Sequence, residues 1–410
     1  MSHGPVEERR PALVKAYDAA KAAGDHDAMA AAALELAGLQ IFGSVPGRIP
    51  AFLFEAYENS EGRRRVELAI AVARVWAYGG QPTRAVPFVA EALSAAEETA
   101  DPGLLAQALD AQLLVLWGPD DFEDRLRAAD RLEDVVANIS DVELQMSAYL
   151  WRLTTALERL DVPAMRRQLR GLEQLSLDSG SARVRFFAAS RRAMHALLVG
   201  DAEEAERARE IAVAAGYEAG EADAYAIDHQ LRGTIAIQRE DVATMLAEAP
   251  HYESFWLSDG VISVGAEAAR LLVCSGQTTH AERLLHELAG ADFGRIPRDV
   301  DWMLSVTALT EVAAALRIKT LCDHAVTLLT PYAGRGVVNG GGVCFVGVVD
   351  HYLALACDAL GREDDARRWW GSAGEAYRRF GAAWWASRCG RPSNIRQRSE
   401  AVLRPAGPGV

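Results

Sequence analysis

Hydrophobic residues recur along this chain at intervals of three and four positions, the spacing that places them on one buried face of a helix. The clearest run covers residues 349–360 and ends at a Leu-Gly turn formed with Gly361. Small and aromatic residues follow at Ala373, Tyr377 and Phe380, where a second helix would cross the first. Because one helix pair cannot bury its own apolar face, we expect copies of this pair elsewhere in the chain.

Similar pairs of periodic runs fill most of the chain, and a short polar turn separates the two runs of each pair. The turns begin at Gly79, Gly118, Leu160, Gly200, Arg239, Ser275, Arg317 and Gly361. Their spacing is about 40 residues, which is close to the longer helical-repeat periods. We therefore predict an all-α fold, a right-handed α-solenoid of about eight or nine tetratricopeptide-like hairpins. No β-sheet is expected between Arg64 and Phe380.

The predicted solenoid covers residues 61–390, and the ends of the chain differ from it. Residues 1–60 are predicted to form an N-terminal helical repeat and an irregular connection at Phe42–Pro50, which contains two prolines and two glycines. A helix restarts in the run that follows this connection. Residues 391–410 are a polar, Pro-rich tail that either frays or forms a short capping helix over Asn394–Leu403.

Composition and charge argue against several functional classes. The 43 Lys and Arg residues are outnumbered by 57 Asp and Glu residues, for a formal charge of -14, so we expect no nucleic-acid partner. The five cysteines lie in the last third of the chain without a CxxC spacing, which indicates core thiols in a reducing compartment. The N-terminus has no apolar leader, and no apolar run approaches the roughly 20 residues of a membrane span. We therefore expect a cytoplasmic protein that does not contact a membrane.

Two local motifs suggest chemistry, and each has a simpler structural interpretation. Asp120, Asp121 and Asp124 match the spacing at which paired carboxylates hold magnesium, but they also follow a turn, where carboxylates cap a helix. The glycines of 334–336 and 340–342 could cradle a phosphate, yet they follow a helix rather than a strand, which favours a flexible loop between repeats. We predict no metal and no cofactor, and common hydrolase motifs do not occur.

One pattern is shared by strings at Leu329–Phe380, Arg74–Leu93, Leu109–Asp121, Tyr149–Val162 and Gly180–Arg207. Together with the core string LALACDALGREDDARRWW, they resemble the helical-repeat arm of actinobacterial LuxR-type ATPase regulators and ATPase-linked adenylate cyclases. In that family the arm senses a ligand or partner and relays the signal to a nucleotide-binding module. This chain has no GxxxxGK[ST] motif, and the segment after Gly390 is too short for a DNA-reading module. The resemblance therefore implies a free-standing sensor or scaffold arm.

Polar and aromatic residues on the first helix of each predicted pair are the candidates for a binding site. They are Trp151, Arg152, Arg191, Arg192, Tyr225, Asp228, His229, Asp301, Trp302, Asp350 and His351. In a right-handed superhelix the first helices line the concave face, so we expect these side chains to converge on a groove between residues 149–180 and 342–380. The alternative is that they are core tryptophans and solvated surface charges. Asp228 and His229, as neighbours on a helix, point about 100 degrees apart and cannot pair with each other.

Cationic, aromatic and imidazole groups in one groove suit a partner that has both an anionic and an apolar part. We therefore predict a regulatory binding or sensor protein, rather than an enzyme, that takes a peptide, a protein or a small molecule in its concave groove. One alternative is an enzyme of specialised metabolism that uses the cavity for acid-base catalysis. Another is a structural scaffold that forms a homo-oligomer.

Overall fold

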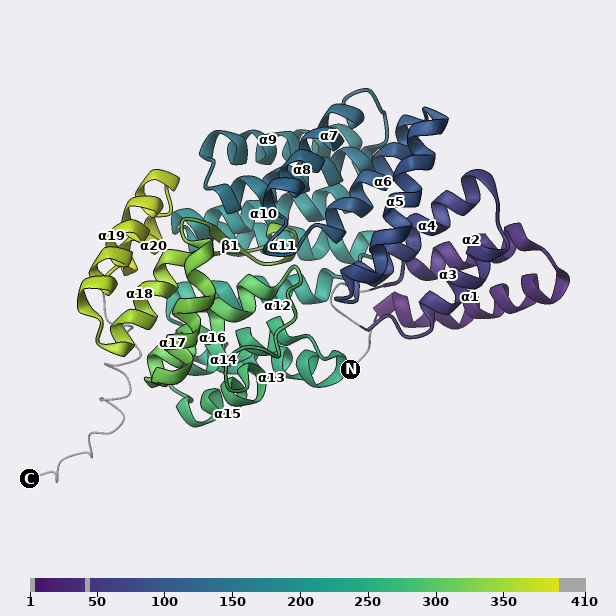
Figure 1. Ribbon diagram of the computed structural model, residues 1–410. Helices are drawn as coiled ribbons and strands as arrows, with labels where there is room; N and C mark the ends of the chain where they lie inside the picture. Colours follow the sequence, from purple (N-terminus) through teal and green to yellow (C-terminus); the bar gives the residue numbers. More distant parts are fainter. Residues whose placement is uncertain (1–3, 41–44, 391–410) are drawn as a thin grey trace, which may run out of the picture. The chain divides into compact units, whose positions relative to one another are not determined.

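The computed structural model describes residues 4–40 and 45–390, and most of them are helical (Figure 1). The fold class is therefore all-α, as predicted. The helices are α1 (Gly4–Ala23), α2 (His26–Ala37), α3 (Ile49–Glu58), α4 (Gly62–Tyr78), α5 (Pro82–Thr99), α6 (Pro102–Val115), α7 (Phe122–Val136), α8 (Val142–Arg159), α9 (Val162–Ser179), α10 (Ala182–Val199), α11 (Ala202–Ala219), α12 (Ala224–Arg239), α13 (Val242–Asp259), α14 (Ile262–Cys274), α15 (Thr278–Ala289), α16 (Trp302–Leu316), α17 (Lys319–Leu329), α18 (Val349–Leu360), α19 (Glu363–Phe380) and α20 (Ala383–Arg388). Between α17 and α18 lie η1 (Thr330–Tyr332), β1 (Gly336–Val338), η2 (Gly340–Gly342) and β2 (Phe345–Val348).

The helix starts follow a regular step. From α4 to α11 the first residues are evenly spaced, at Gly62, Pro82, Pro102, Phe122, Val142, Val162, Ala182 and Ala202. A pair of helices therefore takes about 40 residues, the spacing that the polar turns predict. Local chemistry sets several of the starts, because an aspartate side chain accepts backbone N–H groups of the first turn at Asp101, Asp161, Asp201 and Asp241. Each such cap stabilises its helix by roughly 1 kcal/mol.

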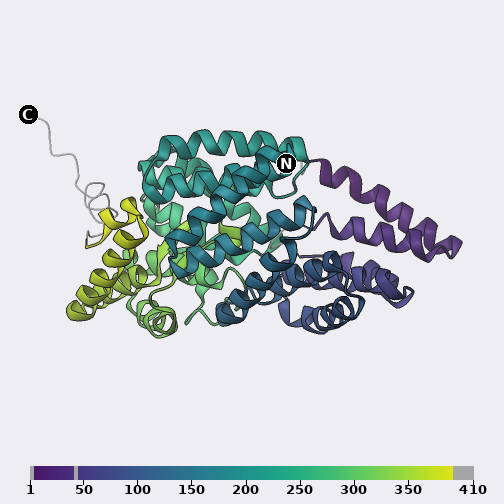
Figure 2. The same ribbon diagram turned by 90° about the horizontal axis from the view of Figure 1, so that it is seen from above.

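Helices that are adjacent in sequence pack against each other, as α4 does with α5 and α18 with α19. Contacts also link alternate helices, because α4 packs on α6, α14 on α16, and α16 on α18. We call the even-numbered helices α4 to α18 the first helices, and the odd-numbered helices α5 to α19 the second helices. Figures 1 and 2 show the same antiparallel pairing for α1 and α2 at the start of the chain.

The chain divides into two compact units, each built from several segments. Unit 1 contains Met1–Thr155, Arg167–Ala188 and Ala212–Tyr225. Unit 2 contains Ala156–Arg166, Ala189–Ile211 and Ala226–Val410.

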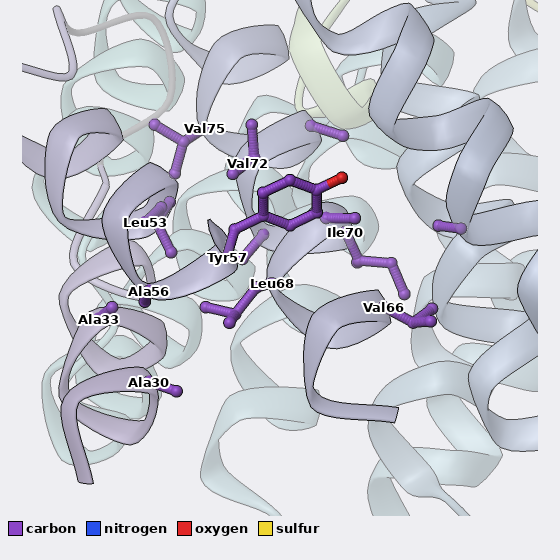
Figure 3. Close-up of a cluster of buried hydrophobic side chains, with 14 of the residues drawn as sticks. Ala30, Ala33, Leu53, Ala56, Tyr57, Val66, Leu68, Ile70, Val72 and Val75 are labelled. Atoms are coloured by element: carbon purple, nitrogen blue, oxygen red, sulfur yellow. The ribbon is translucent and has the colours of Figure 1, made fainter. Parts of the chain in front are cut away.

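Part of the core of unit 1 joins α2, α3 and α4 (Figure 3). The ring of Tyr57 lies beside Leu68, Ile70 and Val72, and its hydroxyl donates to Glu91 Oε2 at 2.5 Å. Leu68 is fully buried, and each aliphatic side chain buried in this way stabilises the fold by about 1.5–3 kcal/mol. Both faces of α4 are covered because a first helix packs against the next first helix as well as against its own partner.

One short sheet interrupts the helices between α17 and α18. β1 pairs antiparallel with β2, with Gly336 opposite Val348 and Val338 opposite Phe345. All residues of both strands are buried. The prediction that Arg64–Phe380 contains no β-sheet is therefore wrong. An apolar run of valines bordered by glycines is compatible with a short buried strand as well as with a helix.

Gly340–Gly342 lie between α17 and α18, where the sequence predicted a loop between repeats, and they form the tip of the hairpin. Gly340–Gly342 make a 3-10 turn in which Gly341 has a φ of 69°, a left-handed conformation that favours glycine. The Cys344 N–H donates to Asn339 Oδ1 at 2.6 Å, which closes the tip. The segment is thus a defined part of unit 2.

The predicted irregular connection before α3 is only partly described. Residues 41–44 and the predicted tail, 391–410 with its capping helix, lie outside the described residues. The helix expected after the connection is α3, which packs on α2 and α4. No helix in the described parts of the chain is both long and apolar enough to span a membrane.

Candidate functional site

The binding residues predicted from the sequence all lie on first helices, except Asp301, which is the N-cap residue of α16. Trp151, Arg152 and Tyr225 belong to unit 1, and the other eight belong to unit 2. The contacts within each unit therefore decide which of these side chains lie together.

In unit 1, Asp110 of α6 holds several side chains of the first helices. The Trp151 indole Nε1 donates to Asp110 Oδ1 at 2.9 Å, and the Ser147 hydroxyl donates to the same oxygen. The indole is buried and meets the ring of Trp117 edge to face, with 4.5 Å between centroids. Trp151 therefore serves to fix Asp110, so that Asp110 Oδ2 has a defined position for a cation.

That cation is Arg74 of α4, the one exposed residue in the buried stretch Val66–Val75. Arg74 Nη1 lies 3.7 Å from Asp110 Oδ2, and the guanidinium also hydrogen-bonds to Tyr78. Neighbouring protein groups desolvate Arg74 and so lower its pKa, but Asp110 and Tyr78 raise it by more, so the side chain stays charged. It nevertheless keeps 45% of its surface exposed. Arg74 therefore stands out as an accessible charge in an otherwise buried stretch of α4.

A second guanidinium, that of Arg183 on α10, has an electrostatic effect on Arg74. Arg183 Nε donates to Glu221 Oε2 at 2.7 Å, and Nη1 donates to Glu143. Burial lowers the pKa of Arg183, and the two carboxylates raise it by more. Its positive charge in turn lowers the pKa of Arg74, which means that the two guanidiniums are close enough to repel each other. The carboxylates of Asp110, Glu143 and Glu221 offset this repulsion, because each guanidinium has at least one of them as a partner.

We call Arg74, Tyr78, Asp110 and Arg183 the Arg74 site. Burial raises the pKa of Tyr78, so its hydroxyl remains protonated at neutral pH. The distance of 3.7 Å between Arg74 and Asp110 exceeds that of a normal hydrogen bond, which leaves guanidinium donors for a ligand. A carboxylate or phosphate that reached Arg74 would form shorter, charge-assisted bonds, and the Tyr78 ring offers apolar surface next to them.

The other predicted residues of unit 1 do not join these four. Arg152 turns toward α7, where its Nε lies 2.9 Å from Glu133 Oε2 and its Nη1 pairs with Asp130. Tyr225 lies in the first turn of α12 and keeps 38% of its surface exposed.

In unit 2, the neighbours Arg191 and Arg192 of α10 face different groups. Arg191 is buried, and its Nε and Nη2 donate to the Gly341 carbonyl at 3.1 and 2.8 Å. Arg192 is more exposed and places its Nε 3.2 Å from Glu204 on α11. One of the two therefore holds the tip of the hairpin, and the other makes a surface ion pair.

Asp228 and His229 of α12 do not pair with each other, as helix geometry predicts. Asp228 pairs with Arg209 and lies 3.8 Å from Arg232. His229 Nδ1 lies 2.5 Å from Glu248 Oε2 on α13. Both members of this second pair are buried, with exposed fractions of 8% and 4%.

Asp301 and Trp302 begin α16 next to the hairpin. Asp301 Oδ2 accepts a hydrogen bond from the Ser263 hydroxyl at 2.9 Å, and the Gly340 backbone also bonds to this carboxylate. Burial raises the pKa of Asp301 to about 6, although both hydrogen bonds oppose the shift. Trp302 is buried, with the Arg298 guanidinium 4.4 Å from its ring centroid.

Asp350 and His351 begin α18, and both are buried. Asp350 Oδ2 accepts the Gly334 N–H, and Oδ1 accepts the Ser372 hydroxyl, both at 2.5 Å. Burial lowers the pKa of His351 to about 3, so its imidazole is neutral. Its ring meets that of Trp370 edge to face at 4.9 Å. These contacts bind parts of the chain to one another, and a ligand-binding role for the eight residues of unit 2 stays a prediction.

Sequence reasoning missed a buried ionic network in unit 2. Arg270 of α14 donates from Nε to Glu311 Oε2 at 2.9 Å and from Nη1 to Glu267 Oε1 at 3.3 Å. Gln230 donates to the other oxygen of Glu267, and Arg388 lies 3.7 Å from Glu311. Burial raises the pKa of Glu311, but the two guanidiniums lower it by more, so the net shift is downward.

The residues of the Arg74 site and of this network share a signal that the sequence contains. Asp110, Glu267 and Glu311 each interrupt an apolar stretch of a first helix. A charge at such a position must have a partner when the helix is buried, because an unpaired buried charge is costly. Which residue pairs with each buried charge depends on the three-dimensional packing of the first helices, so the sequence alone does not reveal it.

The acidic motif at Asp120, Asp121 and Asp124 lies at the start of α7. Asp121 is the N-cap residue but makes no side-chain cap hydrogen bond, and Asp124 pairs with Arg127. A shallow hollow of about 250 Å³ between α6 and α7 is bordered by Asp124, Arg127 and Arg131, and the last of these pairs with Glu97. Across residues 4–40 and 45–390, no cluster of three or more His, Cys, Asp or Glu side chains is placed to hold a metal ion.

The chain matches no family model and no curated protein. Its resemblance to the helical-repeat arm of LuxR-type regulators and ATPase-linked cyclases therefore stays a prediction.

Proposed function

We propose that this chain is a tetratricopeptide-like right-handed α-solenoid that binds a partner through its first helices and acts in regulation. The evenly spaced helix pairs and the contacts between alternate helices support this architecture. Such stacked pairs bring residues of distant sequence position onto one continuous surface. That surface is the usual binding face of helical repeats.

The observation that supports binding most directly is the state of Arg74. Its guanidinium is charged and 45% exposed, although the rest of Val66–Val75 is largely buried, and its partner Asp110 lies 3.7 Å away. An accessible guanidinium binds a carboxylate or phosphate through charge-assisted hydrogen bonds, which are stronger than those between neutral groups. The ligand class that fits is a carboxylate or phosphate attached to an apolar or aromatic group, on a small molecule or a peptide.

Catalysis has weaker support. The best acid-base pair among the predicted residues is His229 with Glu248, and both are more than nine-tenths buried. A general acid or base must reach its substrate directly or through one water molecule. We therefore propose binding rather than catalysis.

The proposal is tested with phenyl phosphate, which combines an anion and an aromatic ring, and with phenol as the uncharged comparison. Isothermal titration should show saturable binding of phenyl phosphate, and Arg74→Ala should weaken it by about 1.5–3 kcal/mol, a factor of roughly 10 to 150. Arg84→Ala is the matched control, because Arg84 lies on second helix α5 and rests on the Trp76 ring.

Two results would contradict the proposal. One is equal affinity for phenyl phosphate in the parent, Arg74→Ala and Arg84→Ala. The other is equal affinity for phenol and phenyl phosphate, since the guanidinium would then contribute nothing. After incubation with cell extract, the compounds that are bound and then released by the Arg74→Ala variant should likewise differ from those released by the Arg84→Ala variant.

A further inference from the structure

The hairpin of unit 2 is held mainly through its backbone. The Gly341 carbonyl accepts two N–H groups of Arg191, at 3.1 and 2.8 Å. The Gly334 N–H donates to Asp350 at 2.5 Å, and the Val348 N–H donates to the Tyr377 hydroxyl at 3.0 Å. Tyr352 donates to the Val346 carbonyl. Four main-chain groups of the segment 334–348 are thus bound by side chains of α10, α18 and α19, and others pair within the hairpin.

The segment also approaches the helices very closely. A Cβ atom on Gly336 would lie 2.3 Å from the Leu157 carbonyl oxygen of α8, and one on Gly341 would lie 2.9 Å from Arg191 Nη2. On α12, the Thr234 hydroxyl lies 3.4 Å from Cys344 Sγ. Four first helices, α8, α10, α12 and α18, therefore contribute groups to one surface around this segment.

The contacts from the helices resemble those that a receptor makes with a bound peptide, which here has the form of a β-hairpin. Hydrogen bonds to main-chain groups give affinity that does not depend on the ligand's side chains, whereas pockets for alternate side chains give specificity. The apolar side chains of Val337, Val346 and Val348 are buried, and they supply the second kind of contact.

We propose that the first helices of unit 2 form a peptide-binding surface whose resident ligand is the chain's own segment 334–348. The surface is closed to an external partner while this segment occupies it. The segment lies between α17 and α18, so it cannot leave without breaking the contacts named above. This surface is separate in composition from the Arg74 site, and the two do not depend on each other.

The test separates the segment from the surface. Residues 334–348 are replaced by a glycine-serine linker of equal length, and a labelled synthetic peptide of residues 334–348 is added to this variant. Fluorescence anisotropy should show saturable binding of the peptide and none of a scrambled peptide of the same composition. Circular dichroism with and without the peptide records whether the variant is folded.

Arg191→Ala in the linker variant should weaken peptide binding at least about tenfold, because two charge-assisted hydrogen bonds are lost. Arg192→Ala should leave it unchanged, because Arg192 is the next residue of the same helix and pairs with Glu204. If the linker variant is unfolded alone, recovery of helical signal on addition of the peptide supports the proposal.

The proposal is overturned by a folded linker variant that ignores the peptide, by equal binding of the scrambled peptide, or by an unfolded variant that the peptide does not restore. Equal peptide affinity in the Arg191→Ala and Arg192→Ala variants also overturns it. None of these results bears on phenyl phosphate binding, which is measured on the intact chain.

Discussion

Replacing Arg270 by leucine should destabilise unit 2 strongly, because it leaves two carboxylates buried without their main partner. The side chains of Glu267 and Glu311 are 7% and 5% exposed, and Arg270 is 4% exposed between them. Removing one partner from such a buried ionic group costs about 3–5 kcal/mol. Arg388 lies 3.7 Å from Glu311 and retains part of the attraction, so we expect the lower end, about 3 kcal/mol.

The pH dependence distinguishes this cause from lost packing. In the parent, burial raises the pKa of Glu311 but Arg270 and Arg388 lower it by more. Without Arg270 the effect of burial dominates, so the folded-state pKa rises and the variant gains stability as acid protonates the carboxylate. The deficit should therefore be smaller at pH 5 than at pH 7.5.

Hydrogen exchange of peptides from α14 and α16, corrected for the intrinsic rate at each pH, measures the local free energy of opening. Arg283→Leu is the control, because Arg283 is 58% exposed in its pair with Glu253 and should contribute less than about 1 kcal/mol. The reasoning fails if Arg270→Leu exchanges no faster than Arg283→Leu, or if its deficit is the same at both pH values.

Three further predictions concern single residues. Asp301→Asn should be more stable than the parent at pH 8 by up to about 3 kcal/mol and should lose this advantage by pH 4. Burial raises the folded-state pKa of Asp301 from 3.8 to about 6, so the parent loses stability as the pH rises from 3.8 to 6. Urea unfolding of both proteins from pH 4 to 8 measures the difference. Gly336→Ala should lower the melting temperature, because its Cβ would collide with the Leu157 carbonyl oxygen, whereas Gly371→Ala meets no atom within 4 Å in α19 and should raise stability by about 0.5–1 kcal/mol. Burial raises the pKa of the Cys344 thiol to about 12. Ellman's reagent at pH 8 should therefore leave this thiol unmodified in the native chain and react with it in urea. Rapid labelling of the native chain at Cys344 would refute its burial.

The helical architecture was accessible from the sequence because two independent local signals agree. Apolar periodicity gives the buried face of each helix, and aspartates such as Asp161 and Asp201 mark the starts of helices by capping them. Both signals act within one turn of chain, so neither requires knowledge of tertiary packing.

The hairpin was missed because its residues satisfy two structures equally well. The run from Val343 to Val349 is apolar throughout, and such a run is compatible with a buried strand or with the start of a helix. What selects the strand is the recess that it fills, where Gly336 comes close to Leu157 and Gly341 comes close to Arg191. These partners are distant in sequence, as the separation of 150 between Arg191 and Gly341 illustrates.

The candidate binding residues other than Asp301 lie on first helices, as expected from the turns, but the directions of their side chains were not predictable. Arg191 and Arg192 are adjacent, yet one is buried against the hairpin and the other pairs at the surface. A shift of one residue rotates a side chain by about 100 degrees around the helix, and periodicity does not place a helix that accurately. Arg74 was missed for the same reason, since it stands in a stretch that otherwise has the pattern of a core helix.

The central claim is that Arg74 is an accessible anion-binding group on the first helices. The most direct measurement is the side-chain N–H spectrum of the chain labelled with ¹⁵N-arginine, in which the Nε–H signal of Arg74 is assigned by its loss in Arg74→Ala. We predict that this signal shifts saturably with phenyl phosphate, does not shift with phenol, and is accompanied by a smaller shift of Arg183. A titration in which phenyl phosphate leaves the Arg74 signal unchanged while other arginine signals move would contradict the account.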